Sequence, residues 1–357
     1  MDDFDNSNIT PGIARILDAS LNRANEGLRV LEDIARMLLN SRELTHKLKS
    51  MRHQLEKFPL VSQLALLTER NSGTDIGPEI SADFPREYKD ILSLVTANAH
   101  RTEQALRTIE EIARLPSYGL ESAMYESMRY SLYTLEKSIF STLSRNEKRI
   151  FIRGLYTILD SSLLGGRNHF DMAKILLENG VKVIQLREKQ MPSGKLLELA
   201  CSLRKLCDSY QALFIVNDCL DIALASGAGG LHLGQEDLPV TVARKHLPLD
   251  TIIGVSVASV KEAKKAESDG ADYISPQAIF ETHSKECPLI GLDALRAIRS
   301  AVSLPVVAIG GINIDNITHV IDAGAESAAV ITSITLSADP EQVVRELIGK
   351  FNPKPNC

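Results

Sequence analysis

The chain has 357 residues, of which 44% are hydrophobic and 24% are charged, so it is long enough for two globular domains with separate cores. Its net charge of −6 argues against a general nucleic-acid-binding surface. The sequence has five cysteines without a C-x-x-C pair, no signal-peptide pattern at its start and no apolar run of membrane-spanning length. We therefore expect a cytoplasmic protein with reduced thiols and neither nucleic acid nor membrane as partner.

Residues 1–145 are expected to form an all-α helical bundle. Apolar side chains between Leu17 and Leu38 recur every three or four residues, as on one helical face, and a second such stripe runs from Ile91 to Ala113. Two further amphipathic segments lie near residues 41–57 and 117–142. The segment NEGLRVLEDIAR at 25–36 returns as EQALRTIEEIAR at 103–114, which predicts two related hairpins packed as a four-helix bundle.

Charged side chains in these two repeats are spaced four residues apart. The pairs Arg29 with Asp33 and Glu110 with Arg114 are examples. On an exposed helix face such a pair is worth about 0.2–0.5 kcal/mol. A structural interpretation is therefore favoured over a catalytic one for these charges.

Residues 146–357 change period and alternate short β-rich runs with helical segments. Eight strand–helix units in this length are the minimum that a TIM (β/α)8 barrel requires. An open doubly wound sheet is the alternative. The absence of a G-x-G-x-x-G opening favours the barrel. The predicted fold is thus an α/β TIM barrel preceded by an all-α helical-bundle domain. The expected strands are 154–160, 181–188, 212–218, 229–234, 252–257, 273–277, 305–311 and 327–333.

The segment VIQLREKQ, residues 183–190, contains an unusual polar row inside a β-rich run. Because strand side chains alternate between faces, Gln185, Arg187 and Lys189 would share one face. Two cations about 6.6 Å apart repel by roughly 2.5 kcal/mol at an effective dielectric near 20. A bound anion would relieve that repulsion.

Further polar side chains follow the neighbouring strands, and the carboxyl ends of barrel strands are where active sites form. Asn217 and Asp218 end the third expected strand, and Asp237 follows the fourth. Two carboxylates without nearby histidine or cysteine ligands suit a hard cation such as Mg²⁺. Either aspartate alone would more often be a helix N-cap, but together beside a cationic row they favour a metal site.

The later strands offer hydroxyls, a lysine and glycine amides. Ser256 lies near the end of the fifth strand, and FETHSKEC after the sixth contains Thr282, Ser284 and Lys285. Loops after strands seven and eight of a barrel often bind phosphate through bare backbone amides. Such a site would here involve Gly311 with its neighbour Gly310, and Ile331 with Thr332, although a tight turn alone could explain the glycines.

Several motifs in fixed order resemble thiamine phosphate synthase over residues 151–348. They are GLYTILD, QLREK, FIVND, LHLGQED, GVSV, PVVAIGGI and AGAESAAVITSI. The N-terminal half resembles a helical extension that carries the LNRANEGLRVLEDIAR signature. The resemblance implies a transferase that joins hydroxymethylpyrimidine diphosphate to a carboxylated thiazole phosphate, releasing diphosphate and carbon dioxide with Mg²⁺ as cofactor.

The same resemblance implies a role for each site residue. Gln185, Arg187, Lys189 and Asn217 would bind the pyrimidine diphosphate, while Asp218 and Asp237 hold Mg²⁺. Ser256 and Lys285 would line the diphosphate site, and the thiazole substrate would contact Thr282 and Ser284. Gly311 and the backbone of Ile331 and Thr332 would bind the thiazole phosphate. Lys189, Arg187, Ser256 and Lys285 are the expected catalytic groups.

Alternatives remain at this point. A thiazole tautomerase would not require the full metal and diphosphate set, and a non-catalytic phosphate-binding barrel would not require clustered charges. The loop at 275–281, SPQAIFE, departs from the family's glycine-rich pattern, which leaves open the affinity for the thiazole and its exact form. For the bundle, homo-oligomerisation or substrate handover is preferred over pyrimidine kinase activity, because no phosphate-binding glycine loop is present.

Overall fold

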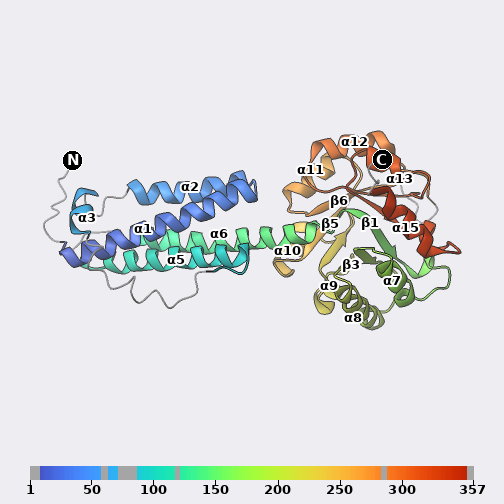
Figure 1. Ribbon diagram of the computed structural model, residues 1–357, viewed down its shortest axis with the longest axis horizontal. Helices are drawn as coiled ribbons and strands as arrows, with labels where there is room; N and C mark the ends of the chain where they lie inside the picture. Colours follow the sequence, from blue (N-terminus) through green and yellow to red (C-terminus); the bar gives the residue numbers. More distant parts are fainter. Residues whose placement is uncertain (1–8, 58–62, 71–86, 117–120, 283–287, 352–357) are drawn as a thin grey trace. The chain divides into compact units, whose positions relative to one another are not determined.

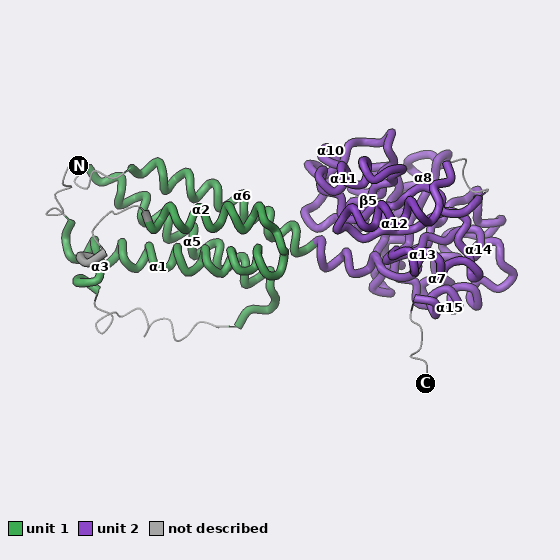
Figure 2. Tube along the Cα trace, turned by 90° about the horizontal axis from the view of Figure 1, so that it is seen from above, with its two compact units in different colours: residues 1–144 green, residues 145–357 purple. Residues whose placement is uncertain are grey.

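A computed structural model describes residues 9–57, 63–70, 87–116, 121–282 and 288–351 of the chain. The chain divides into two compact units, residues 1–144 and residues 145–357 (Figure 2). We call them the helical unit and the barrel unit. Each is described by itself below.

The barrel unit contains one parallel sheet of eight strands in the order β6-β5-β4-β3-β2-β1-β8-β7. A parallel bridge between Ile274 of β6 and Val306 beside β7 closes the sheet into a barrel. This confirms the predicted TIM-type architecture. The strands are β1 (Gly154–Leu159), β2 (Val183–Leu186), β3 (Leu213–Asn217), β4 (Gly230–Leu233), β5 (Ile252–Val257), β6 (Tyr273–Pro276), β7 (Val307–Ile309) and β8 (Ser327–Val330).

Helices surround these strands (Figure 1). They are amphipathic and bury their apolar side against the outer face of the sheet, which forms the larger core of this unit. Left-handed glycines at Gly180, Gly227, Gly270 and Gly324 let the chain turn from helix into strand. The helices are η6 (Ser161–Leu163), α7 (His169–Glu178), α8 (Ser193–Ser209), α9 (Leu220–Ser226), α10 (Val240–His246), α11 (Val260–Ser268), α12 (Gly291–Ala301), α13 (Ile317–Asp322), α14 (Thr332–Thr335) and α15 (Pro340–Phe351).

A second, smaller core fills the inside of the barrel. Its side chains come from alternate positions of the strands, because these point inward. It includes Tyr156 of β1 and Tyr273 of β6, both almost fully buried. The barrel is therefore closed by packed side chains at this level.

The helical unit forms around one apolar core to which all of its long helices contribute. The helices are α1 (Pro11–Asp33), a π-helical turn η2 (Ile34–Leu38), α2 (Arg42–Lys57), α3 (Gln63–Glu69), α5 (Ile91–Ala113) and α6 (Ser122–Arg149), the last of which continues into the barrel unit. The predicted apolar stripe of the first helix packs on the core, with Leu21 half-buried and the end of the stripe exposed. Leu38 is exposed because it belongs to the π-helical turn, whose wider period rotates it away from the core.

The prediction of exposed charge pairs in the repeats is wrong for the two glutamates that occupy equivalent positions. Glu32 and Glu110 are buried, with 4% and 0% of their side chains exposed. Each accepts a hydrogen bond from an arginine of the following helix, Arg52 or Arg129, at 3.0 Å. The two pairs therefore tie each hairpin of the repeat together from inside.

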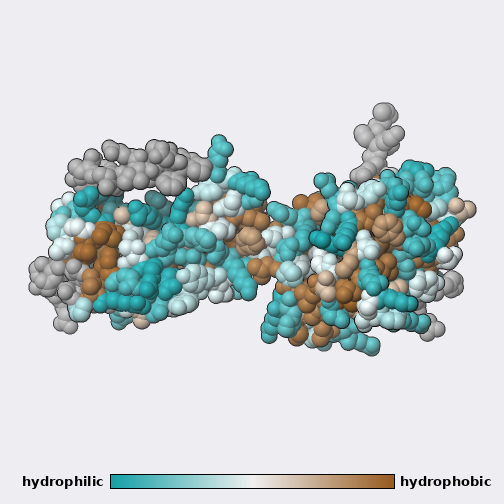
Figure 3. Space-filling view, turned by 90° about the horizontal axis from the view of Figure 1, so that it is seen from below, coloured by the Kyte–Doolittle hydropathy of each residue, from teal (hydrophilic) through white to brown (hydrophobic). Residues whose placement is uncertain are grey.

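The surface in view is largely hydrophilic, with apolar side chains in separate patches (Figure 3). Among the described residues, no helix has both the length and the apolar character needed to cross a membrane. The polar segment at 71–86 lies outside the described residues.

Beside the core of the helical unit, one carboxyl group faces an unfavourable environment. Burial, together with the nearby carboxylate of Glu136, raises the pKa of Glu103 from 4.5 to about 7. Its Oε1 atom is buried and has no hydrogen-bond partner within the described part of the chain. His100, on the same helix as Glu103, lies 3.6 Å from Glu136. Its charge lowers the pKa of Glu103 and so offsets only part of the rise.

We predict that Glu103→Gln stabilises the protein at high pH. The unfolded chain ionises Glu103 near 4.5 and the folded chain near 7, so folding stability falls as pH rises through that window. The variant should gain about 1 kcal/mol at pH above 7, a value reduced for solvent screening, and nothing below pH 4.5. Urea unfolding at both pH values measures this, with Glu121→Gln as an exposed control. An equal gain at both pH values would contradict the assignment.

Candidate active site

One cavity of about 490 Å³ lies at the carboxyl ends of the barrel strands. Its size is typical of sites that enclose small molecules. It is lined by 11 of the 13 side chains or backbone segments singled out from the sequence, which the structure thus brings together. They are Gln185, Arg187, Lys189, Asn217, Asp218, Asp237, Ser256, Thr282, Gly311, Ile331 and Thr332. Ser284 and Lys285 lie outside the described residues.

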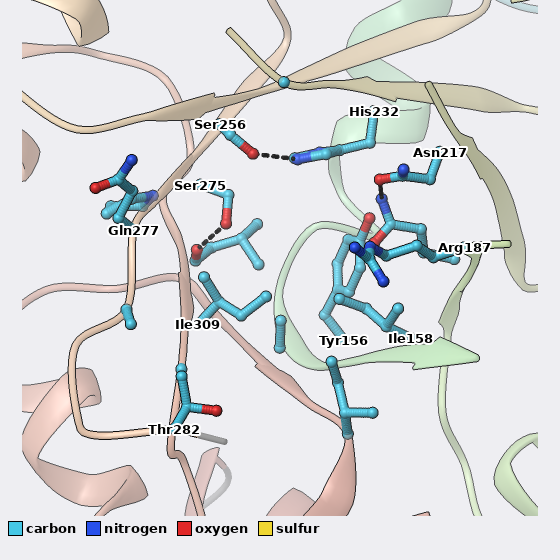
Figure 4. A pocket seen from close by; sticks show the side chains of 18 of the residues that line it. Tyr156, Ile158, Arg187, Asn217, His232, Ser256, Ser275, Gln277, Thr282 and Ile309 are labelled. Carbon is cyan, nitrogen blue, oxygen red and sulfur yellow. Dashed lines mark hydrogen bonds between the residues drawn. The ribbon is translucent and has the colours of Figure 1, made fainter. Parts of the chain in front are cut away.

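The polar row after β2 is arranged as alternation requires, although the strand itself ends at Leu186. The backbone N–H of Arg187 still donates to the carbonyl of Leu159 at 2.9 Å, which continues the pairing with β1 by one residue. Gln185 is buried and donates to the side chain of Asn217 at 3.2 Å (Figure 4). Arg187 and Lys189 both line the cavity.

The two cations of this row form ion pairs with different aspartates. Arg187 forms an ion pair with Asp160, which is at the end of β1 and has 6% of its side chain exposed. Lys189 donates to Asp218 at 2.5 Å, and 55% of its side chain is exposed. The predicted repulsion is therefore offset within the protein, and a ligand anion would add to this balance.

Glu188 points the other way and fixes the backbone that presents the two cations. Its carboxylate accepts hydrogen bonds from the N–H and the hydroxyl of Ser161, at 2.6 and 2.8 Å. The ring of His169 lies 2.6 Å from the same group. With only 3% of this side chain exposed, the segment after β2 is tied to the loop after β1.

The two aspartates expected to bind metal lie next to each other. Burial, and then the adjacent carboxylate of Asp218, raise the pKa of Asp237, while the N–H of Gly234 donates to Asp237 at 2.6 Å and acts in the opposite direction. Asp218 itself has a left-handed backbone, with φ of 61°, which aspartate tolerates better than most side chains. The pair therefore concentrates negative charge at the rim, where a divalent cation would be favoured.

The glycines after β7 have a packing role of their own. Both have positive φ values, 95° for Gly310 and 63° for Gly311. A Cβ atom on Gly310 would lie 2.5 Å from the Cα of Ala278, and one on Gly311 would lie 2.3 Å from the carbonyl oxygen of Glu281. These glycines let the loop after β6 lie directly on the end of β7, and they also border the cavity.

The loop at 275–281, whose sequence departs from the family pattern, is anchored by backbone hydrogen bonds. The N–H groups of Ile279 and Phe280 donate to the carbonyls of Ile309 and Gly310, at 2.9 and 3.1 Å. Gln277 lines the cavity, and its side-chain oxygen is buried with no hydrogen-bond donor in the described part of the protein. A ligand N–H could supply that donor.

Several residues that line the cavity, and one that pairs with a lining residue, were missed by sequence reasoning or were assigned only to packing. Asp160 could have been found, since it ends the first β-rich run as Asp218 follows the third. Tyr156 and Tyr273 gave no signal, because inward-pointing aromatic residues of strands resemble ordinary core. His232 lies on an expected strand, where a single histidine indicates a packing residue; it does lie inside the barrel, but its ring also borders the cavity.

The fold and the site together define a class: a (β/α)8 barrel with a ligand cavity at the carboxyl ends of its strands, rimmed by carboxylates and cations. Comparison with known proteins identifies the family within this class. A family model described as "Thiamine monophosphate synthase" matches residues 155–334, and a model described as "ThiD2 family" matches residues 15–138.

Relatives similar to nearly the whole chain carry the same name. The thiamine-phosphate synthase of Nostoc punctiforme is 36% identical over 95% of this chain and 94% of its own length. That of Synechocystis sp. is 36% identical over 96% of this chain and 98% of its own. A solved structure, the thiamine phosphate pyrophosphorylase of Pyrococcus furiosus, is 39% identical with a TM-score of 0.53, covering 57% of this chain and 98% of that one. The chain belongs to the thiamine-phosphate synthase family, whose members are transferases.

We predict that Asp218→Asn lowers the pKa of Asp237. The substitution removes the neighbouring negative charge, and it leaves Lys189, which favours the ionised form of Asp237, without its ion-pair partner. A titration of the Asp237 carboxyl carbon by NMR measures the change. Asp221→Asn, an exposed substitution on α9, is the matched control. An unchanged or higher pKa would contradict the proximity of the two carboxylates.

Proposed function

We propose that the barrel unit synthesises thiamine phosphate by joining hydroxymethylpyrimidine diphosphate to a carboxylated thiazole phosphate, with release of diphosphate and carbon dioxide. The observation that carries the proposal is the cluster of Arg187, Lys189, Asp218 and Asp237 around one cavity at the barrel rim. Family membership supports the substrate assignment, since the relatives are named for the same product.

The proposed metal site consists of Asp218 and Asp237. The two carboxylates fit Mg²⁺ because they lie next to each other at the cavity rim and offer the oxygen ligands that this cation prefers. When bound, Mg²⁺ would neutralise charge on the diphosphate and so make it a better leaving group. Lys189, already hydrogen-bonded to Asp218, would then be free to turn toward a diphosphate oxygen.

The proposed reaction begins at the CH₂–O bond of the pyrimidine substrate. That bond breaks with its electron pair leaving on the diphosphate, and the carbon becomes a benzylic-type cation that the thiazole partner attacks. The cations Arg187 and Lys189 would stabilise the charge growing on the leaving oxygen, which is the largest effect such a site can supply. Asp160 pairs with Arg187, and Glu188 anchors the backbone between the two cations to the loop after β1. Gln185 and Asn217 would contact the same substrate.

The other wall of the cavity is proposed to bind the thiazole phosphate. Thr282, Gly311, Ile331 and Thr332 line it. Ser284 and Lys285, which extend this set by resemblance, stay predictions outside the described residues. The buried, unpartnered oxygen of Gln277 marks where recognition by this chain would differ from that of relatives with a glycine-rich loop.

The two rival functions are disfavoured by the same cluster. A thiazole tautomerase needs no diphosphate site, and a non-catalytic barrel would keep opposed charges at its rim without use for them. Homo-oligomerisation through the helical unit and a cytoplasmic location stay predictions from the sequence.

The proposal predicts that Lys189→Ala and Asp237→Ala each lower turnover at least 100-fold while the fold is kept. Each removes a group that would stabilise the leaving diphosphate, directly or through Mg²⁺. The assay mixes the purified protein with both substrates and Mg²⁺ and quantifies thiamine phosphate, and circular dichroism monitors the fold. Lys182→Ala, before β2 at the opposite end of the barrel, is the control and should be silent. Turnover undiminished by a metal chelator would remove the aspartate assignment.

A shortened chain that begins at residue 145 should still make thiamine phosphate. Every residue that lines the cavity belongs to the barrel unit, and the Pyrococcus furiosus relative corresponds to little more than this part of the chain. Arg145 is retained in the shortened chain because it donates to Asp272 at 2.9 Å and so supports the barrel. We expect kcat within about threefold of the full chain, measured in the same assay. Complete loss with a folded barrel would show that the helical unit takes part in the reaction.

A further inference from the structure

A continuous chain of hydrogen bonds crosses the inside of the barrel and ends at the cavity. The hydroxyls of Tyr156 and Tyr273 lie 2.9 Å apart, and the Tyr273 hydroxyl lies 3.0 Å from Nδ1 of His232. The other ring nitrogen of His232, Nε2, lies 3.0 Å from the hydroxyl of Ser256 (Figure 4). These four residues come from β1, β6, β4 and β5, and all of them border the cavity.

A glycine on β5 leaves the space that this chain of hydrogen bonds requires. His232 of β4, Gly254 of β5 and Tyr273 of β6 are in register, so Gly254 stands between the two side chains that meet. A Cβ atom on Gly254 would lie 1.9 Å from the Tyr273 ring. Only glycine leaves room for the tyrosine ring to lie across β5 and reach the histidine.

Counting hydrogens fixes the direction of the chain. The four groups carry four polar hydrogens when the imidazole is neutral, but three links use only three of them. Burial raises the pKa of both tyrosines, so their hydroxyls keep their hydrogens. One hydrogen is therefore left over on one of the three hydroxyls, that of Tyr156, Tyr273 or Ser256.

The three hydroxyls differ in what surrounds them. Tyr156 and Tyr273 are only 2% and 0% exposed, and within the described residues the links already counted are the hydrogen bonds of their hydroxyls. A hydroxyl hydrogen left unpaired at either position would be unfavourable, because a buried donor loses its hydrogen bond to water without gaining another. Ser256 is half-buried and faces the cavity, where its hydrogen can meet a ligand or water. The spare hydrogen therefore belongs on Ser256.

We infer that Tyr156, Tyr273 and His232 are positioning residues that make Ser256 a hydrogen-bond donor to the bound ligand. Tyr156 donates to Tyr273, Tyr273 donates to Nδ1 of His232, and the Nε2–H group of His232 donates to the Ser256 oxygen. The lone pair that would face the histidine is thereby occupied, and the serine hydrogen is directed into the cavity. The identity of the acceptor rests on the proposed function: it is an oxygen of the diphosphate leaving group.

The same direction excludes a different role for the Ser256–His232 pair. Side by side, a serine and a histidine resemble a nucleophile and its base. A base must accept the serine hydrogen, yet here Nε2 is itself the donor. Ser256 is thus a binding group for an anion and forms no covalent intermediate.

The first test determines the tautomer of His232 by ¹⁵N NMR of the full-length protein without substrates. The inference requires a protonated Nε2 and a bare Nδ1. The signals are assigned through the variant His232→Gln and, independently, through contacts of the ring with Tyr273. A protonated Nδ1 would overturn the inference. This measurement holds whether or not the proposed reaction occurs.

The second test is a double-variant cycle on turnover. Ser256→Ala should lower kcat about 10- to 100-fold, the loss of one hydrogen bond to a charged group. Tyr273→Phe should lower kcat about tenfold with little change in KM, because it releases the His232 ring. The double variant should be within about threefold of Ser256→Ala alone, since both act through one hydrogen bond.

A matched control and two opposite outcomes make the cycle decisive. Tyr210→Phe, before β3 at the other end of the barrel, should leave kcat unchanged. Multiplying losses in the double variant would show that Tyr273 acts by packing alone and would overturn the inference. If the unaltered protein makes no thiamine phosphate, the proposed function fails while the tautomer result still decides the direction of the chain.

Discussion

Closure of the parallel sheet is the constraint on which the site depends. Because all eight strands run the same way round a closed barrel, every residue that follows a strand is delivered to one rim. Arg187, Asp218 and Asp237 are separated by tens of residues in sequence, yet they face one cavity for this reason. The chemistry is thus assembled by topology, and each strand needs to supply only one or two polar groups.

Charge balance at that rim is kept without burying any single charge alone. Arg187 is paired with the nearly buried Asp160, whereas Lys189 is paired with the more accessible Asp218. A buried pair of this kind is costly to break, and an exposed one is worth little. The arginine is therefore suited to a fixed position, while the lysine can exchange its partner for a ligand at small cost. That difference fits a site through which a charged group must enter and leave.

Sequence patterns predicted the fold because the period of the apolar residues changes from helix to strand near residue 150 and the strand ends repeat a polar signature. They also located the rim residues, since position after a strand is enough to place them. They could not give the pairing of Arg187 with Asp160, which depends on how two neighbouring loops meet. They also failed at Glu32 and Glu110, because spacing by four residues is the same on an exposed face as on a buried one. Only the partner helix decides which face is covered.

The polar chain from Tyr156 to Ser256 shows why a barrel interior can serve the site above it. An aromatic core of phenylalanines would pack the same space but would take the Tyr273 hydroxyl away from Nδ1 of His232. Two tyrosine hydroxyls instead fix the imidazole from below, and Gly254 provides the gap through which they do so. The cost of burying polar groups is low because each link satisfies the next. The hydroxyl hydrogen of Ser256 is the one left to face the cavity. The interior of the barrel thus determines that Ser256 donates a hydrogen bond there.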